Sequence, residues 1–176
     1  GGPWAGNATS SIEVNSDHVL LDHIWAWRGD HGVGGTGTWT GSRGDHGLVV
    51  NGDSVTATGL FVEHYQKNQV VWNGQDGVTV FYQSEIPYEV PSQAAWMDGS
   101  RAGYASYRVA DDVTRHAAYG LGIYSFFNQG ADIWAESGVQ APRTAHVTFE
   151  SITTVMLNGA GGIRHQVNDA GETEYV

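Results

Sequence analysis

The sequence predicts an all-β protein and, within that class, a right-handed, single-stranded parallel β-helix with long inserted loops. Three observations support this. The 25 glycines among 176 residues indicate many tight turns. Short β-branched and aromatic runs alternate with turn residues, and no stretch has convincing helical periodicity. The segment 48–87 contains two imperfect copies of one unit. An antiparallel sandwich or jelly roll also has many short strands, but the tandem repeat favours the solenoid.

The repeated unit fixes a distance along the chain between two glutamates. The run Val49-Val50-Asn51-Gly52 returns as Val71-Trp72-Asn73-Gly74, and Glu63 returns as Glu85, so that 85 − 63 = 22. The Asn-Gly pairs are typical of turns, because both residues accept positive φ. If each copy is one coil, the two glutamates lie on neighbouring strands about 4.8 Å apart. Their carboxyl groups can then share one site.

The remaining chain is expected to continue the coils with three interruptions. Loops are expected over 28–46, 87–102 and 128–142, each carrying a tryptophan, and loops of this length in a compact domain are often functional. The expected strands are 11–14, 19–27, 47–51, 55–65, 69–73, 78–86, 103–110, 113–127, 145–157 and 163–168.

Composition excludes several classes of function. The formal net charge is −11 and Lys67 is the single lysine, so no basic patch for nucleic acid can form. The chain has no cysteine, which excludes disulfides, thiolate zinc sites and a thiol nucleophile. No apolar run is long enough to span a membrane. We expect one domain over 1–176. Because the chain begins at Gly1 without an initiator methionine, we expect it to be part of a longer protein.

The glutamate pair suggests glycoside hydrolysis. Alternation along the strand places Leu60 and Val62 on one face and Glu63 on the other, so Glu63 faces outwards if the apolar face is the core. Cleavage of a glycosidic bond needs one carboxylic acid for the leaving oxygen and a second group that activates water or attacks carbon. Two glutamates in different environments can have separated pKa values and thus separate roles. Exposed glutamates on a sheet are more often only solvated.

Aromatic residues give candidate sugar platforms. Seven tryptophans and eight tyrosines fit either core stacking or walls for sugar rings, and the sequence does not separate the two. The candidates for substrate binding are Trp39, His64, Tyr65, Trp72, Gln83, Trp96 and Trp134.

Histidine suggests a metal site only weakly. Three Asp-His pairs occur, at 22–23, 30–31 and 45–46, but neighbouring residues on a strand point to opposite faces. No segment follows the EF-hand calcium pattern, a dinucleotide fingerprint or a phosphate loop. We therefore expect neither a metal nor a cofactor.

Long ungapped strings in this chain resemble the C-terminal β-helix of glycoside hydrolase family 55, which has a pectate-lyase-like solenoid fold. They are L-L-D-H-I-W-A-W-R-G-D-H-G, V-V-N-G-D-S-V-T-A-T-G-L-F-V-E-H-Y-Q-K and V-V-W-N-G-Q-D-G-V-T-V-F-Y-Q-S-E-I-P-Y. The later strings G-Y-A-S-Y-R-V-A-D-D-V and G-L-G-I-Y-S-F-F-N resemble it too. The resemblance covers the chain from about Ser11 to Asn168.

The resemblance implies an activity and a larger assembly. Family 55 comprises inverting, exo-acting β-1,3-glucanases of laminarin-like chains, built from two tandem right-handed β-helices with the active site between them. It implies that Glu85, in Y-Q-S-E, is the general acid and that Glu63, in V-E-H, helps to position the nucleophilic water. Other groups that hold the water come from the N-terminal β-helix. The chain is therefore expected to be the C-terminal part of a secreted enzyme, to have that β-helix and a poly- or oligosaccharide as partners, and to hold only part of a site.

Two alternatives stay open at this point. The first is a polysaccharide lyase or another β-helix glycosidase. A lyase would use arginines such as Arg28, Arg43 and Arg101 against acidic sugars, although the net charge of −11 disfavours an anionic substrate. A non-enzymatic carbohydrate-binding or structural β-helix would bind glycans without turnover and would not depend on either glutamate.

Overall fold

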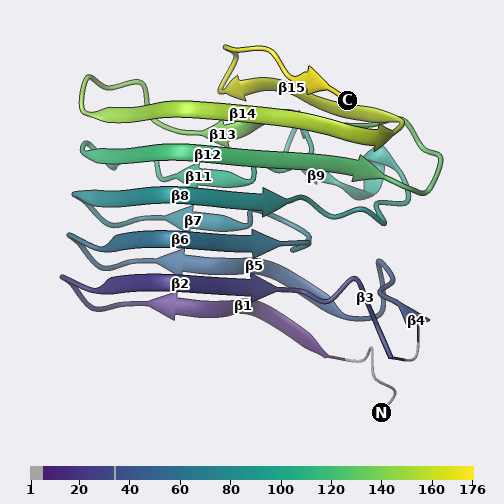
Figure 1. Cartoon of the computed structure of the whole chain (residues 1–176), viewed down its shortest axis with the longest axis horizontal. Coiled ribbons are helices and arrows are strands. Elements are labelled where there is room, and N and C mark those ends of the chain that lie inside the picture. Colours follow the sequence, from purple (N-terminus) through teal and green to yellow (C-terminus); the bar gives the residue numbers. More distant parts are fainter. Residues whose placement is uncertain (1–5, 34) are drawn as a thin grey trace.

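Two six-stranded parallel sheets run through the computed structural model, which describes residues 6–33 and 35–176 (Figure 1). The first sheet contains β1 (Asn7–Val14), β5 (Arg43–Val50), β7 (Val70–Trp72), β11 (Tyr107–Val109), β13 (Ile133–Gln140) and β15 (Gly161–Val167), in that order. The second contains β2 (Leu20–Trp27), β6 (Thr56–Glu63), β8 (Gly77–Glu85), β12 (His116–Phe127), β14 (Val147–Gly159) and β16 (Glu174–Tyr175), again neighbour to neighbour.

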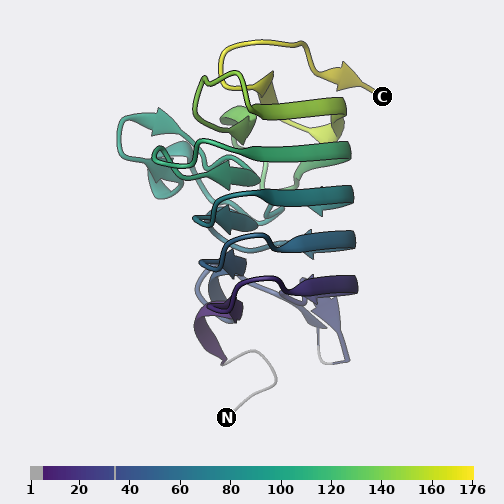
Figure 2. The same ribbon diagram turned by 90° about the vertical axis from the view of Figure 1, so that its left-hand side faces the viewer.

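Successive strands of the chain alternate between the two sheets, so each coil contributes one strand to each. Figure 2 shows these coils stacked from the N-terminal to the C-terminal end. Every pairing within the two sheets is parallel. This all-β arrangement of parallel strands is consistent with the predicted β-helix.

Small elements lie outside the coils. Two short antiparallel hairpins pair β3 (His31–Gly32) with β4 (Gly35–Thr36) and β9 (Met97–Asp98) with β10 (Arg101–Ala102). One turn of 3-10 helix, η1 (Gln93–Ala95), is the only helical segment in the described residues. None of the described residues forms a helix with the length and apolarity needed to cross a membrane.

The register between β6 and β8 confirms the coil spacing predicted from the repeat. Thr56 pairs with Val78 and Glu63 pairs with Glu85, an offset of 22 residues in both cases. The predicted Asn-Gly turns also stack. The Asn73 side chain donates to Asn51 Oδ1 at 2.7 Å. Asn51 in turn donates to an asparagine in the preceding coil. This ladder keeps the coils in register at the end of the first sheet.

A column of left-handed residues crosses the second sheet. Its members have φ between 52° and 68° and occupy equivalent positions on five successive strands: His23, Gly59, Phe81, Gly120 and Ser151. An irregularity of this kind shifts the side-chain alternation by one residue. Consequently Thr79 and Tyr82 are both buried although they are three residues apart. The column explains why the strand predicted over 78–86 lacks clean alternation.

Two of the loop predictions are wrong in extent. The expected loop 128–142 contains the strand β13, in which Ile133, Ala135 and Val139 are buried and supply an alternating pattern that the neighbouring Trp134 and Glu136 obscure. The expected loop 28–46 ends earlier, because β5 begins at Arg43. The connection between β8 and β11 does leave the coils, as predicted, and carries η1, β9 and β10.

Candidate active site

Glu63 and Glu85 lie side by side at the C-terminal ends of β6 and β8. Leu60 and Val62 are fully buried between the sheets, so Glu63 projects from the outer face, as predicted. The column of left-handed residues lies N-terminal to the pair on both strands, so the two glutamates keep the same orientation. The coil repeat therefore brings the two carboxyl groups to one place on the surface.

The carboxyl group of Glu63 is held by neighbouring side chains and is largely covered. Trp25 Nε1 donates a hydrogen bond to Glu63 Oε2 at 2.8 Å, and the Gln83 amide lies against the same group. The residue is only 9% exposed. Burial raises the pKa of Glu63, the charges of Glu85 and Asp30 raise it further, and the hydrogen bonds from Trp25 and Gln83 oppose the shift.

The raised pKa of Glu63 has a consequence for stability. A carboxyl group whose pKa is higher in the folded chain than in the unfolded chain binds its proton more tightly in the fold. Its stabilising contribution is present below the ordinary pKa and is lost as pH rises through the raised value. Wherever Glu63 is ionised, its charge is therefore kept at some cost to stability, which is a common property of catalytic groups.

Glu85 is the more accessible member of the pair, with its side chain 28% exposed. The Tyr88 hydroxyl donates to Glu85 Oε2 at 2.5 Å. Burial, together with this hydrogen bond and the charge of Glu85, raises the pKa of Tyr88, so that its hydroxyl stays protonated and remains a donor. His64 Nε2 lies 3.4 Å from the same carboxylate oxygen and 3.5 Å from Asp30 Oδ1.

His64 sits behind the pair in a turn held by an arginine. Its ring is buried and packs edge-on against Tyr88 at 4.6 Å. Burial lowers the pKa of His64, against the opposing effect of Asp30 and Glu85, so the imidazole is neutral near pH 7. Arg28 Nη1 donates to the His64 carbonyl oxygen at 2.7 Å and forms an ion pair with Glu89 at 2.6 Å. This bridge fixes the turn that follows Glu63.

Aromatic side chains form a wall beside the glutamates, and the sequence predictions missed them. Trp25 is 61% exposed and stacks on Trp27 with ring centroids 5.2 Å apart. With Phe61 and Phe81, Trp25 lines a concavity of about 240 Å³. Trp27 pairs with Glu63 across the sheet, but at an offset of 36 residues (63 − 27). The 22-residue repeat does not reveal that offset, although aligning the LLDHIWAW and TATGLFVE strings would have done so.

Three of the predicted sugar platforms lie in the core. Tyr65, Trp72 and Trp96 are 3%, 0% and 1% exposed, respectively. Tyr65 follows His64, whose φ of +66° reverses the direction of the next side chain, so alternation from Glu63 does not continue. Trp72 faces inwards from β7 and stacks on Tyr107. These three predictions are corrected, because a buried ring offers no face to a sugar.

The other four predicted substrate-binding residues lie at three places. Gln83 and His64 lie at the glutamate pair. Trp134 lies on β13 in the other sheet, where the Arg164 guanidinium covers its ring at 4.4 Å. Trp39 is half-buried and lines a separate concavity of about 110 Å³ with Lys67 and Trp96. The structure thus places two of the four at the pair. In the described part of the chain no three histidine, aspartate or glutamate side chains are gathered as ligands for a metal ion.

Comparison with known proteins places this geometry in context. Residues 1–85 match the model of the LAM55 pectate lyase-like domain. The chain is 48% identical over 172 residues to an exo-β-1,3-glucanase of Streptomyces sp. strain SirexAA-E, and the alignment covers 98% of this chain and 28% of that protein. The structure of the present chain matches that of sacteLam55A from Streptomyces sp. SirexAA-E with a TM-score of 0.89 and 46% identity, over 98% of this chain and 31% of the other. A variant of sacteLam55A in complex with glucose matches equally well in TM-score, at 45% identity.

These matches confirm the predicted resemblance to glycoside hydrolase family 55. The chain spans less than a third of the length of these relatives.

Proposed function

We propose, since the chain resembles glycoside hydrolase family 55, that it carries part of the active site of a β-1,3-glucan hydrolase. One observation carries the proposal: Glu63 and Glu85 lie one coil apart on neighbouring strands and face the same way. The named relative is an exo-β-1,3-glucanase, which supports both the reaction and the substrate class. The exposed face of Trp25 beside the pair suits the apolar face of a glucose ring.

We assign the general acid to Glu85 and the orientation of water to Glu63. Glu85 is the member of the pair that a leaving oxygen can approach, whereas Glu63 is enclosed by Trp25 and Gln83. In the proposed step Glu85 gives its proton to the glycosidic oxygen as the bond to the anomeric carbon breaks. A water molecule that Glu63 helps to orient attacks that carbon from the opposite face and gives its proton to a general base of the completed site, so the product has inverted configuration.

The spacing of the pair indicates that further groups complete the site. An inverting enzyme holds the attacking water on the face of the sugar ring opposite its acid, with the acid and base carboxyls about 6.5–9.5 Å apart. Glu63 and Glu85 project from neighbouring strands of one sheet, whose backbones are about 4.8 Å apart, so a group from outside this sheet is needed to complete the water site. We propose that the remaining groups come from an N-terminal β-helix of the same protein, that this chain is the C-terminal part, and that the whole enzyme is secreted and exo-acting.

The anomeric configuration of the first product tests this proposal. The parent enzyme would be incubated with laminarin, and with α-1,3-glucan, pectin and xylan as controls, while proton NMR follows the first sugars released. We expect α-glucose from laminarin and no comparable release from the controls. Initial β-glucose would indicate retention and make one glutamate a nucleophile. An unsaturated product absorbing in the ultraviolet would show a lyase. Binding of glycans without turnover would show a binding module.

A further inference from the structure

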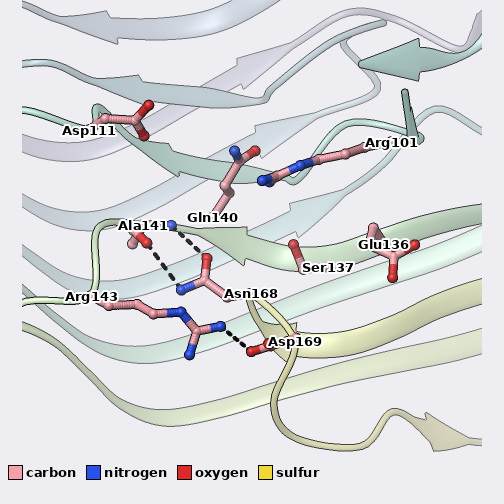
Figure 3. Close-up of a pocket in the computed structure, with 9 residues that line it drawn as sticks. All are labelled: Arg101, Asp111, Glu136, Ser137, Gln140, Ala141, Arg143, Asn168 and Asp169. Atoms are coloured by element: carbon pink, nitrogen blue, oxygen red, sulfur yellow. Dashed lines mark hydrogen bonds and ion pairs between the residues drawn. The ribbon is translucent and has the colours of Figure 1, made fainter. Parts of the chain in front are cut away.

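A second cavity lies on the outer face of the first sheet, around the ends of β13 and β15 (Figure 3). Its volume is about 330 Å³, at the lower end of the range typical of small-molecule sites, which is about 300–1,000 Å³. Its lining is dominated by polar and charged side chains, among them Arg101, Asp111, Glu136, Ser137, Gln140 and Arg143. The candidate active site lies on the other sheet, at the C-terminal ends of β6 and β8.

The lower edge of this cavity is braced by hydrogen bonds. Asn168 Oδ1 accepts from the Ala141 backbone N–H, and Asn168 Nδ2 donates to the Ala141 carbonyl, both at 3.0 Å. The next residue, Asp169, forms an ion pair with Arg143. Figure 3 shows these two bridges side by side below the cavity. The turns after β13 and β15 are therefore fixed to each other, and the polar groups above them are held in place before any ligand binds.

The upper side presents an amide between two arginines. In the orientation that satisfies both of its ends, Gln140 Oε1 accepts from Arg101 Nη1 at 2.7 Å and from Arg108 Nη1 at 3.2 Å. Its NH₂ group then faces acceptor atoms, so the amide is held at both of its ends. Gly138 faces the core, where a Cβ would lie 2.7 Å from the Thr154 side chain. Ser137 lines the cavity beside it, so its hydroxyl adds a second neutral donor and acceptor.

The charges of the lining select for an uncharged ligand. Three arginines, Arg101, Arg143 and the Arg108 that donates to Gln140, stand against three carboxylates, Asp111, Glu136 and Asp169, so that 3 − 3 = 0. Because these charges balance, the lining favours neither an anion nor a cation. A divalent cation would need several carboxylates together, and no such group of three occurs in the described chain. The lining instead offers guanidinium, amide and carboxylate groups, which are planar donors and acceptors. Such groups can form hydrogen bonds with the neighbouring hydroxyl groups of a neutral sugar.

We infer that this cavity is a second, non-catalytic carbohydrate site that takes a short neutral oligosaccharide. Trp134 precedes Glu136 by two residues on β13, and Arg164 covers its ring at 4.4 Å and approaches Glu136 at 3.6 Å. A sugar chain leaving the cavity along β13 meets this aromatic and guanidinium pair next. The choice of a β-1,3-glucan as the ligand rests on the proposed function; the existence of a sugar site here does not.

NMR titration of the 176-residue chain with laminaritriose tests the inference. Laminaritriose is expected to shift the backbone amides of Ser137, Gln140 and Asn168. The double variant Arg101→Ala/Gln140→Ala alters exposed or half-buried side chains outside the core. Its affinity for laminaritriose, measured from the shifts of these amides, should be at least about tenfold lower. Two variants should leave this binding unchanged: Arg115→Ala, a matched exposed arginine elsewhere, and Glu85→Gln.

The outcomes separate this site from the proposed function. If the parent enzyme does not hydrolyse laminarin but laminaritriose still binds in this cavity, the proposed function is contradicted and the second sugar site is supported. Shifts with maltotriose as large as those with laminaritriose would keep the sugar site and overturn its selectivity for β-1,3-glucan. The inference is overturned if no sugar shifts these amides, if the double variant binds as tightly as the original chain, or if sulfate or calcium shifts the amides more strongly than laminaritriose.

Discussion

Replacing Glu85 by glutamine in the parent enzyme is expected to lower the turnover of laminarin by about 10²–10⁴-fold, the usual contribution of a positioned proton donor. The amide is nearly isosteric with the acid and can still accept from Tyr88, but it cannot supply a proton to the glycosidic oxygen. Binding of laminari-oligosaccharides should persist. Steady-state rates on laminarin and calorimetric titration with laminaritriose measure the two quantities separately.

The same experiment distinguishes Glu85 from Glu63 as the acid. The raised pKa of Glu63 is itself a property of proton donors, so Glu63→Gln is the matched variant. A substrate with a nitrophenolate leaving group needs no protonation. Activity on such a substrate should therefore recover in Glu85→Gln but not in Glu63→Gln. Turnover of laminarin that is unchanged in Glu85→Gln, or recovery in Glu63→Gln alone, would refute the assignment of the acid.

Replacing Gly74 by alanine is expected to cost about 3 kcal/mol of the free energy of unfolding, at the upper end of the usual cost of overpacking. A Cβ at Gly74 would lie 1.8 Å from the backbone oxygen of Gly52 in the preceding coil. Backbone cannot move aside as the end of a flexible side chain can. The variant should therefore separate the stacked Asn51 and Asn73 turns and loosen the coils that carry the glutamate pair.

Chemical denaturation of the 176-residue chain measures this loss. Gly6→Ala is the matched control, because a Cβ there has no atom within 4 Å. That variant should change stability by no more than about 0.5 kcal/mol. Equal stability of Gly74→Ala and Gly6→Ala would mean that the coils are not stacked as closely at this turn as the structure has them.

The sequence predicts the β-solenoid and the register of its central coils because the repeat is local and ungapped. The 22-residue offset between Glu63 and Glu85 needs no knowledge of the loops. The same reasoning fails for Tyr65, because alternation assumes extended backbone and His64 has a φ of +66°. It also fails for Trp72: the string VVW does not say which of its residues face the core.

Residues of the candidate site outside the repeat were harder to predict. Trp25 and Trp27 reach Glu63 only through pairing of β2 with β6, and the segment between these strands makes that coil 14 residues longer than the next (36 − 22). Tyr88 comes from the connection after β8, and its contact with Glu85 depends on how that connection folds back. Periodicity gives the direction of a side chain on a strand, but it gives nothing about such a contact.

The most direct test of a shared site is the pKa of the Glu63 carboxyl group, followed by carbon-13 NMR in the original chain and in Glu85→Gln. The charge of Glu85 adds to burial in raising the pKa of Glu63, so neutralising residue 85 should lower that pKa towards its ordinary value. Glu136→Gln, on the other sheet, should leave it unchanged. The same Glu63 pKa in the original chain and in Glu85→Gln would show that the two carboxyl groups do not face each other, and would contradict the account of a single site.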